Sequence, residues 1–240
     1  MNEPLPDTLA QSAMLRSVIS RSALEDGAAA AVTTGGAGVA DLRRDAWGHG
    51  LLEVARVVTA AGARAVRVDD ADDVALLRAE AIDATCTEAP ELDPRLLYGL
   101  PDATGALPGR PVMRVAGRVL STKDIAAGDG VSYGYIHRAP EDSRLALVTG
   151  GYAQGVVRAL GSRAAVEIDG VVHPIVGRIA MDVCVVDIGE ADVAVGAEVT
   201  YFGGSGPLSA GVADWARITG MGVDELVAVV GQRTERAWEA

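Results

Sequence analysis

The 240-residue sequence predicts an α+β fold in which a small α/β part precedes a mostly β domain. Two observations predict this. Helix-like and strand-like segments alternate as far as about residue 93, which is the order found in α/β folds. From residue 94 the chain is a series of short runs rich in Val and Ile, which is typical of strands. We therefore divide the chain into two predicted domains, residues 1–93 and 94–240.

The first 40 residues are predicted to form a helix and then a looser segment. Helical spacing predicts an amphipathic helix over 9–25, with an inward face made of Leu15, Val18 and Ile19. The run 27–40, rich in Ala, Gly and Thr, has weak periodicity and indicates a loose strand and a loop. Its glycines at 35, 36 and 38 are a weak phosphate-loop signal, and a flexible connection explains them better.

Residues 51–78 are predicted to form a helix, a strand and a second helix. One face of the first helix, which Gly62 ends, carries Leu51, Leu52, Ala55 and Val58. A short strand is predicted over 65–68. Asp70 is a suitable N-cap for a helix that continues through Arg78.

The second domain is predicted to contain strands over 112–120, 130–136, 144–150, 164–168, 171–176, 181–188 and 198–202. Asp169-Gly170 is a strong signal for a two-residue hairpin turn. A helix over 209–219 follows, and Gly220 ends it; its inward face carries Val212, Trp215, Ala216 and Ile218. The tail, 224–238, fits a helix by its first residues and a strand by its Val-rich run.

Composition and charge exclude several functions. The apolar share of 49% is enough for a core. The net charge of −12 argues against nucleic acid and anionic membranes as partners. The first residues lack the features of a secretory signal, and no apolar run is long enough to span a bilayer. Cys86 and Cys184 have no metal-ligand spacing, so we expect free thiols, no metal site and a cytoplasmic location.

The stretch ADLRRDAWGHG at 40–50 resembles the cofactor-lysine motif of alanine racemases, roughly AVVKADAYGHG. The lysine of that motif carries pyridoxal phosphate (PLP) as a Schiff base. The residues that match are Asp45, Gly48, His49 and Gly50. Arg43 stands at the position of the lysine, and Trp47 stands at that of a tyrosine that contacts the cofactor phosphate. An arginine cannot form the Schiff base, because its guanidinium stays protonated.

The second half of the chain carries four motifs similar, in order and spacing, to the C-terminal β-domain of alanine racemases: GDGVSYG, GGYAQGVVR, PIVGRIAMDVCVVDI and VGAEVTYFG. Residues 36–80 resemble an early part of the family's (β/α)8 barrel, and RLLYGLPD at 95–102 resembles the segment that leaves its eighth strand. A closed barrel takes about 200 residues or more. The resemblance therefore implies a truncated barrel remnant over 1–93, followed by a racemase-type β-domain over 94–240.

The resemblance implies a substrate side that is retained. Tyr133 matches the catalytic tyrosine, which the partner subunit supplies and which moves the α-proton on the face opposite the lysine. Met181 and Asp182 match residues that bind or face the substrate. Arg178 matches an arginine at the site entrance. Tyr152 matches a gate tyrosine, although Gln154 replaces the Asp that usually follows it.

The resemblance also implies a cofactor side that is lost. A late tyrosine that reaches the phosphate falls near Asp224, whose negative charge repels phosphate. The arginine that pairs with the pyridine nitrogen falls on Leu92, and Arg95 reaches this place only in a shifted alignment. His49 is expected to have a structural role. Lys123, the only lysine of the chain, is expected at an exposed strand end.

The family interconverts L- and D-alanine and supplies D-alanine for peptidoglycan. We expect this chain to be a pseudoenzyme of that family, without PLP racemisation of its own. Three alternatives stay open. The chain is an active PLP-dependent racemase with an atypical site that recruits Lys123, or a non-catalytic dimerisation or interaction module that docks on an intact racemase barrel, or a gene remnant without a selected role. The expected partners are a second copy or a racemase-type barrel, and a small amino acid if the chain is active.

Overall fold

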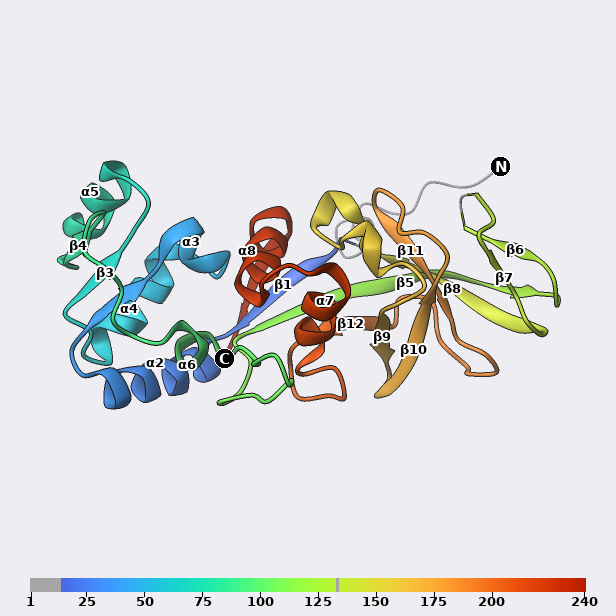
Figure 1. Ribbon diagram of the computed structural model, residues 1–240, viewed down its shortest axis with the longest axis horizontal. Helices are drawn as coiled ribbons and strands as arrows, with labels where there is room; N and C mark the ends of the chain where they lie inside the picture. The colour runs from blue at the N-terminus through green and yellow to red at the C-terminus, as the bar shows by residue number, and fades with distance from the viewer. Residues whose placement is uncertain (1–13, 133) are drawn as a thin grey trace.

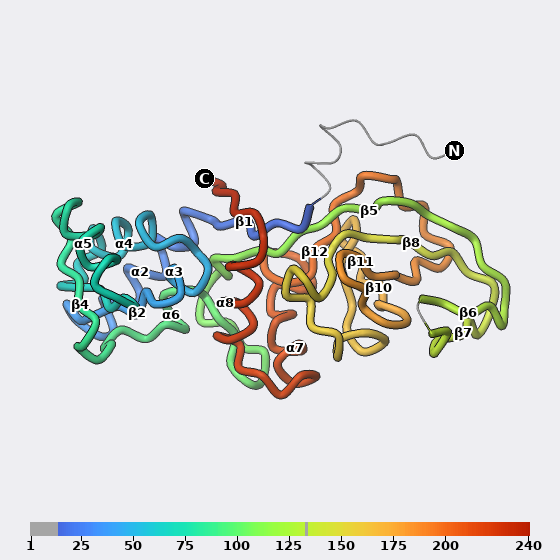
Figure 2. Tube along the Cα trace, turned by 90° about the horizontal axis from the view of Figure 1, so that it is seen from above, coloured from blue at the N-terminus to red at the C-terminus, as the bar shows by residue number. Residues whose placement is uncertain are grey.

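The structure, a computed structural model, describes residues 14–132 and 134–240. An α/β part lies at one end of the molecule and a β barrel at the other (Figure 1). Helix α8 (Val223–Arg233) lies between the two parts, as the view from above also shows (Figure 2). Within the described residues, no helix combines the length and the apolar character that crossing a bilayer requires.

The α/β part is built on a three-stranded parallel sheet in the order β2-β3-β4. Its strands are β2 (Val39–Asp41), β3 (Ala65–Arg67) and β4 (Ala84–Thr85). The helices are α2 (Arg21–Gly35), α3 (Arg43–Trp47), α4 (Leu51–Ala60), α5 (Ala71–Ala79) and α6 (Pro94–Tyr98). The predicted helices near 51–62 and 70–78 and the predicted strand near 65–68 are therefore confirmed.

The outer edge of β2 is covered by the chain that leads to α6. The backbone N–H groups of Glu91 and Leu92 donate to the carbonyl of Val39 at 2.8 and 3.1 Å. The Glu91 carboxylate accepts from the Val39 N–H at 3.1 Å. Unpaired strand edges invite association with other chains, and these contacts remove one such edge from the short sheet.

The β part is a six-stranded barrel in the order β12-β9-β10-β11-β8-β5, closed by pairing of β12 with β5. The strands are β5 (Met113–Ile125), β8 (Ser143–Thr149), β9 (Ala165–Ile168), β10 (Val171–Val176), β11 (Val183–Asp187) and β12 (Glu198–Phe202). The predicted hairpin is confirmed, because Asp169 and Gly170 have φ of 51° and 78° between the paired residues Ile168 and Val171.

Helix α7 (Gly211–Thr219) packs on the barrel as predicted, with Val212, Trp215 and Ile218 buried. The Trp215 ring lies edge-on to Phe202 at a centroid distance of 5.2 Å. In the tail, the Val-rich run lies in helix α8, so the helix alternative is right and the strand alternative is wrong for that run. The strand β13 (Glu235–Glu239) follows only after the run has ended. Both cysteines are free thiols, as expected.

The helix predicted over 9–25 is wrong within the described residues. Residues 16–20 form strand β1 (Arg16–Ser20), which pairs antiparallel with β5 and parallel with β13. The alternating burial of Ser17 and Ile19, both 0% exposed, fits a strand between two neighbours. The helix begins only at Arg21, where the Ser20 hydroxyl accepts from the Ala23 N–H.

Two further predictions are wrong. The run 27–40 is helical as far as Gly35, because its alanines are the strongest helix formers. The strand over 130–136 is reduced to β6 (Gly130–Val131), which pairs with β7 (His137–Arg138). Ser132 and Tyr135 have φ of 61° and 48°, which ends strand geometry there. The division at residue 93 stays a prediction.

Candidate functional site

The motif over 40–50 lies where two parallel strands end. Arg43 follows β2, and Asp69 follows β3. Ligands of α/β folds bind beside the carboxyl ends of such strands. A cavity of about 460 Å³ lies at this place, between α3 and α8. It is lined by Asp41, Arg43, Arg44, Trp47, Asp69, Met221, Asp224, Glu225, Ala228, Val229 and Gln232.

Arg43 is held by Asp41 in a two-point ion pair. Its Nε donates to Oδ1 at 2.8 Å, and its Nη2 donates to Oδ2 at 2.6 Å. Asp41 is only 5% exposed. The hydrogen bonds to this carboxylate raise the pKa of the Arg43 guanidinium above its ordinary value. The alanine racemase motif has Val at the position of Asp41 and Lys at the position of Arg43. Both members of the ion pair therefore differ from the motif.

The charges that line the cavity do not suit PLP. The cavity is lined by four carboxylates and two guanidiniums, those of Asp41, Asp69, Asp224, Glu225, Arg43 and Arg44. The Arg44 N–H donates to Asp69 Oδ2 at 2.5 Å, and its Nε lies 3.9 Å from Oδ1. Both cations therefore face a carboxylate already. A phosphate dianion would meet excess negative charge here, and Trp47 offers no hydroxyl in place of the family's tyrosine.

His49 and two aromatic rings form the inner side of the motif. The His49 Nδ1–H donates to the carbonyls of Ala46 and Trp47 at 2.9 and 3.1 Å. Tyr98 stacks on both His49 and Trp47, at centroid distances of 4.5 and 5.2 Å, and its hydroxyl donates to the Asp41 carbonyl at 3.0 Å. Complete burial lowers the pKa of His49 to about 4. The imidazole is therefore neutral, which agrees with a structural role.

Four of the residues predicted on the substrate side, Tyr152, Arg178, Met181 and Asp182, lie in two segments that meet at a second place. The segments 150–154 and 178–182 face each other: the Gly150 N–H donates to the Asp182 carbonyl at 2.9 Å, and the Tyr152 N–H donates to the Ala180 carbonyl at 3.0 Å. Gln154 donates from Nε2 to Asp182 Oδ1 at 2.9 Å. The guanidinium of Arg158 lies over the Tyr152 ring at 5.3 Å. Tyr152 is in the short helix η1 (Tyr152–Gln154).

Arg178 connects this second place to the β6–β7 hairpin. The Ser132 hydroxyl donates to the Arg178 carbonyl at 2.8 Å. The Met181 side chain is exposed, with 55% of its surface accessible. Tyr133 lies outside the described residues. The hairpin that flanks it is at the opposite end of the molecule from the three-stranded sheet (Figure 1).

Among the residues that the structure describes, the two predicted sides therefore do not come together in one chain. Tyr152, Arg178, Met181 and Asp182 are absent from the lining of the cavity that contains Arg43 and Trp47. Asp224 does line that cavity, on α8. Leu92 is buried, while Arg95 lies 3.9 Å from Asp102 at the surface. Lys123 is exposed in β5.

Several residues of this region were not identified from the sequence. The signal for Asp41 was present, since it replaces an apolar residue of the motif beside the changed lysine. Asp69 follows a predicted strand, which also marks the ligand edge of a parallel sheet. Arg236 gave no local signal, because it contacts Asp45 from 191 residues farther along the chain.

Comparison with known proteins agrees with this architecture. The family model described as "Alanine racemase, C-terminal domain" matches residues 112–238. The alanine racemase of Streptomyces coelicolor is 38% identical over 129 residues, which are 54% of this chain and 33% of that protein. The alanine racemase of Desulfovibrio desulfuricans is 40% identical over 148 residues, 60% of this chain and 39% of that protein. The matched region thus spans between a third and two fifths of these relatives.

Solved alanine racemases share the fold. The structure from Streptomyces coelicolor A3(2) has a TM-score of 0.81 at 21% identity, with 95% of this chain and 99% of that chain covered. The structure from Bartonella henselae, which has covalently bound pyridoxal phosphate, has a TM-score of 0.77 at 17% identity, with 95% and 100% covered. The predicted α+β class, with a racemase-type β-domain, is confirmed. The chain belongs to the alanine racemase family, and the family's C-terminal domain occupies residues 112–238.

Proposed function

We propose that this protein is an alanine racemase-family member that does not racemise alanine with PLP by itself. The observation that carries the proposal is the ion pair of Arg43 with the buried carboxylate of Asp41. A PLP racemase needs an amine at this place that can lose its proton and attack a carbonyl. A guanidinium cannot, and its pairing with Asp41 favours the charged form further.

A second support is that no lysine lines the cavity among the residues that the structure describes. Lys123 is the only lysine of the sequence, and it lies in β5 opposite Leu145 of the barrel. It is not among the residues that line the cavity. Recruitment of Lys123, which an active racemase with an atypical site requires, would need a separate cofactor site on the barrel.

The decisive experiment combines trapping and turnover. The protein is incubated with PLP and borohydride, and lysine adducts are sought by mass spectrometry. In parallel, it is incubated with PLP and L-alanine in deuterated water, and the α-proton is followed by NMR. We expect no stoichiometric adduct and no exchange above that with free PLP. An adduct at Lys123 with exchange above this background would establish the active alternative instead.

A second candidate function is docking on an intact racemase barrel. The chain would contribute the segments 150–154 and 178–182 to the active site of that barrel. Apolar exposure favours it: Tyr135 is 67%, Ile136 60% and Met181 55% exposed, on two segments that the Ser132–Arg178 hydrogen bond joins. Exposed apolar side chains grouped in this way are typical of interaction surfaces. A cytoplasmic location, a dimer and a link to D-alanine supply for peptidoglycan stay predictions.

This second function is tested by mixing the chain with a full-length alanine racemase. A hetero-oligomer in size-exclusion chromatography, together with a changed racemisation rate, is the expected result. The variant Ile136→Asp should abolish both effects, and Val195→Asp, at another exposed apolar residue, should not. If the proteins elute separately and the rate is unchanged, the chain has no such docking function.

A further inference from the structure

The turn that carries the racemase motif has a backbone conformation that local interactions alone do not favour. Arg44, Asp45, Ala46 and Trp47 have φ of 56°, 57°, 52° and 54°, so that α3 is left-handed over four consecutive residues, none of them glycine. The left-handed conformation is unfavourable for each such residue, because its Cβ lies too close to the following carbonyl oxygen. Contacts from elsewhere in the chain must therefore hold the turn.

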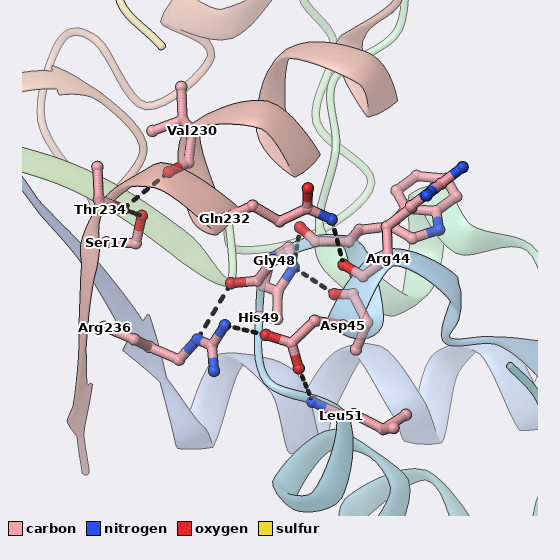
Figure 3. A network of polar contacts seen from close by, with 12 residues as sticks. Ser17, Arg44, Asp45, Gly48, His49, Leu51, Val230, Gln232, Thr234 and Arg236 are labelled. Atoms are coloured by element: carbon pink, nitrogen blue, oxygen red, sulfur yellow. Dashed lines mark hydrogen bonds and ion pairs between the residues drawn. The ribbon is translucent and has the colours of Figure 1, made fainter. Parts of the chain in front are cut away.

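Apart from the Asp69 carboxylate, which accepts from the Arg44 N–H, these contacts come from residues 231–236, which we name the latch segment (Figure 3). Gln232 Nε2 donates to the Arg44 carbonyl at 3.1 Å. Arg236 Nε donates to the Gly48 carbonyl at 3.1 Å, and its Nη2 pairs with the carboxylate of Asp45. Both carbonyls belong to the strained turn or its end, so the latch segment satisfies acceptors that the left-handed conformation presents.

Asp45 joins the latch segment to the helix that follows the turn. One carboxylate oxygen is paired with Arg236, and the other accepts from the Leu51 N–H, the first of α4, at 2.7 Å. A carboxylate at a helix N-terminus is favourable in itself. The Asp45 side chain therefore connects the turn to the first residue of α4. Its negative charge is balanced by Arg236.

The two backbones also touch, at Gly48 and Gly231. A Cβ atom on Gly48 would lie 2.6 Å from the Gly231 Cα, and a Cβ on Gly231 would lie 2.7 Å from the Gly48 Cα. No side chain fits there without a shift. The close approach brings α8 near enough for Gln232 to reach the turn.

The latch segment is anchored in the β part, not in the α/β part. Arg236 lies in β13, which pairs in parallel with β1. The Thr234 hydroxyl donates to the Val230 carbonyl at 2.9 Å and lies 2.5 Å from the Ser17 hydroxyl. The strained turn of one part is therefore held by a strand of the other.

We propose that the latch segment is a conformational device that sets the shape of the cavity at Arg43, with the Arg236–Asp45 pair as its main contact. The cavity walls are the turn, with Arg43, Arg44 and Trp47, and α8, with Asp224 and Gln232. Release of Arg236 lets the turn relax toward right-handed or extended backbone, and this separates the two walls. The latch segment would act in this way whether or not the protein has racemase activity.

The test is hydrogen–deuterium exchange of the full-length protein, read by mass spectrometry on peptides that cover 44–51. We expect Arg236→Gln to speed exchange of these amides about tenfold or more, a change of about 1.4 kcal/mol in local opening. Arg236→Lys, which keeps the charge but not the two-point geometry, should lie between Arg236→Gln and the unchanged protein. Peptides from β8 and β11 should exchange as before.

Two further variants keep the test decisive. Asp45→Asn removes the same ion pair from the other side, and its side-chain oxygen can still accept from Leu51, so it should reproduce the effect even if Arg236→Gln fails to fold. Arg217→Gln removes an exposed pair with Asp214 in α7 and should change nothing at 44–51. Unchanged exchange at 44–51 in both latch variants, or an equal increase in β8 and β11, would overturn the proposal.

Discussion

Single residues show how the cofactor side of this protein departs from its family. Arg43 is not a lysine that has merely been exchanged, because Asp41 has become its counter-ion and is almost fully buried. A buried carboxylate without a cation is costly, so each residue of the pair depends on the other. The change at 43 is therefore part of a local arrangement of charges, which also includes Asp69 and Asp224 of the cavity.

This coupling predicts that restoring the lysine alone does not restore a PLP site. In Arg43→Lys, Asp41 would pair with the new ammonium group, raise its pKa and disfavour the free amine. We expect the yield of borohydride-trapped PLP adduct at residue 43 to stay near that of Arg44→Lys, an exposed neighbour that reports non-specific labelling. Stoichiometric labelling of Lys at 43 but not at 44 would show that the acidic lining is no barrier.

The buried imidazole of His49 predicts a dependence of stability on pH. Its pKa is lowered to about 4 in the folded protein, against 6.5 for a free histidine. Below pH 6.5 the unfolded chain binds a proton that folded His49 does not, so stability falls as the pH falls from 6.5 to about 4. The loss attributable to His49 is about 3 kcal/mol across this window, and it is absent at neutral pH.

Urea unfolding at a series of pH values measures this dependence. His49→Asn, which keeps a donor toward the Ala46 carbonyl, should lose the part of the slope that lies between pH 6.5 and 4. His137→Gln, at a partly exposed histidine, should keep the slope. If His49→Asn retains the full slope, the proton is taken up elsewhere in the protein.

At the scale of elements, local sequence signals were sufficient wherever local interactions decide the structure. The Asp70 cap, the helix near 51–62 and the Asp169-Gly170 hairpin were predicted because their contacts lie within a few residues. Strand β1 was not, because its partners β5 and β13 are about 100 and 220 residues away in sequence. The left-handed turn of α3 was not predicted either, because the latch segment that holds it lies far away in the sequence, at residues 231–236.

The cap of α5 allows a quantitative prediction. The Asp70 carboxylate accepts from the N–H groups of Asp72 and Asp73, both at 3.0 Å. Asp70→Ala should destabilise the protein by about 1 kcal/mol. The pKa of Asp73 is raised by burial and, after that, by repulsion from Asp70; Asp70→Asn keeps the acceptor and removes this repulsion, so it should be neutral or slightly stabilising. Chemical denaturation measures the free energy of unfolding of both variants. If both lose the same amount, the charge of Asp70 stabilises α5, and its capping hydrogen bonds do not.

At the scale of the molecule, the resemblance correctly identified the β-domain but could not show how the two parts are joined. The family model begins at residue 112, yet β1, at residues 16–20, extends the barrel sheet beside β5. The first described strand and the last one therefore belong to the β part, while the residues between β1 and β5 form the α/β part. The chain crosses between the parts at both ends of the α/β part, and the latch segment links them a third time.

This arrangement predicts that the two parts unfold together. Removal of residues 235–240 deletes β13, which pairs with β1, and also Arg236 and Trp238; the Trp238 ring lies 5.2 Å from the Arg21 guanidinium at the start of α2. We expect a loss on the order of 3 kcal/mol and a single, lower thermal transition, because β13 supports elements of both parts.

Removal of Ala240 alone is the matched control and should leave the midpoint unchanged. Thermal unfolding followed both by circular dichroism at a helix wavelength and by tryptophan fluorescence should give coincident curves. Two separated transitions in the shortened chain would show that the α/β part is stable without the strand that connects it to the barrel.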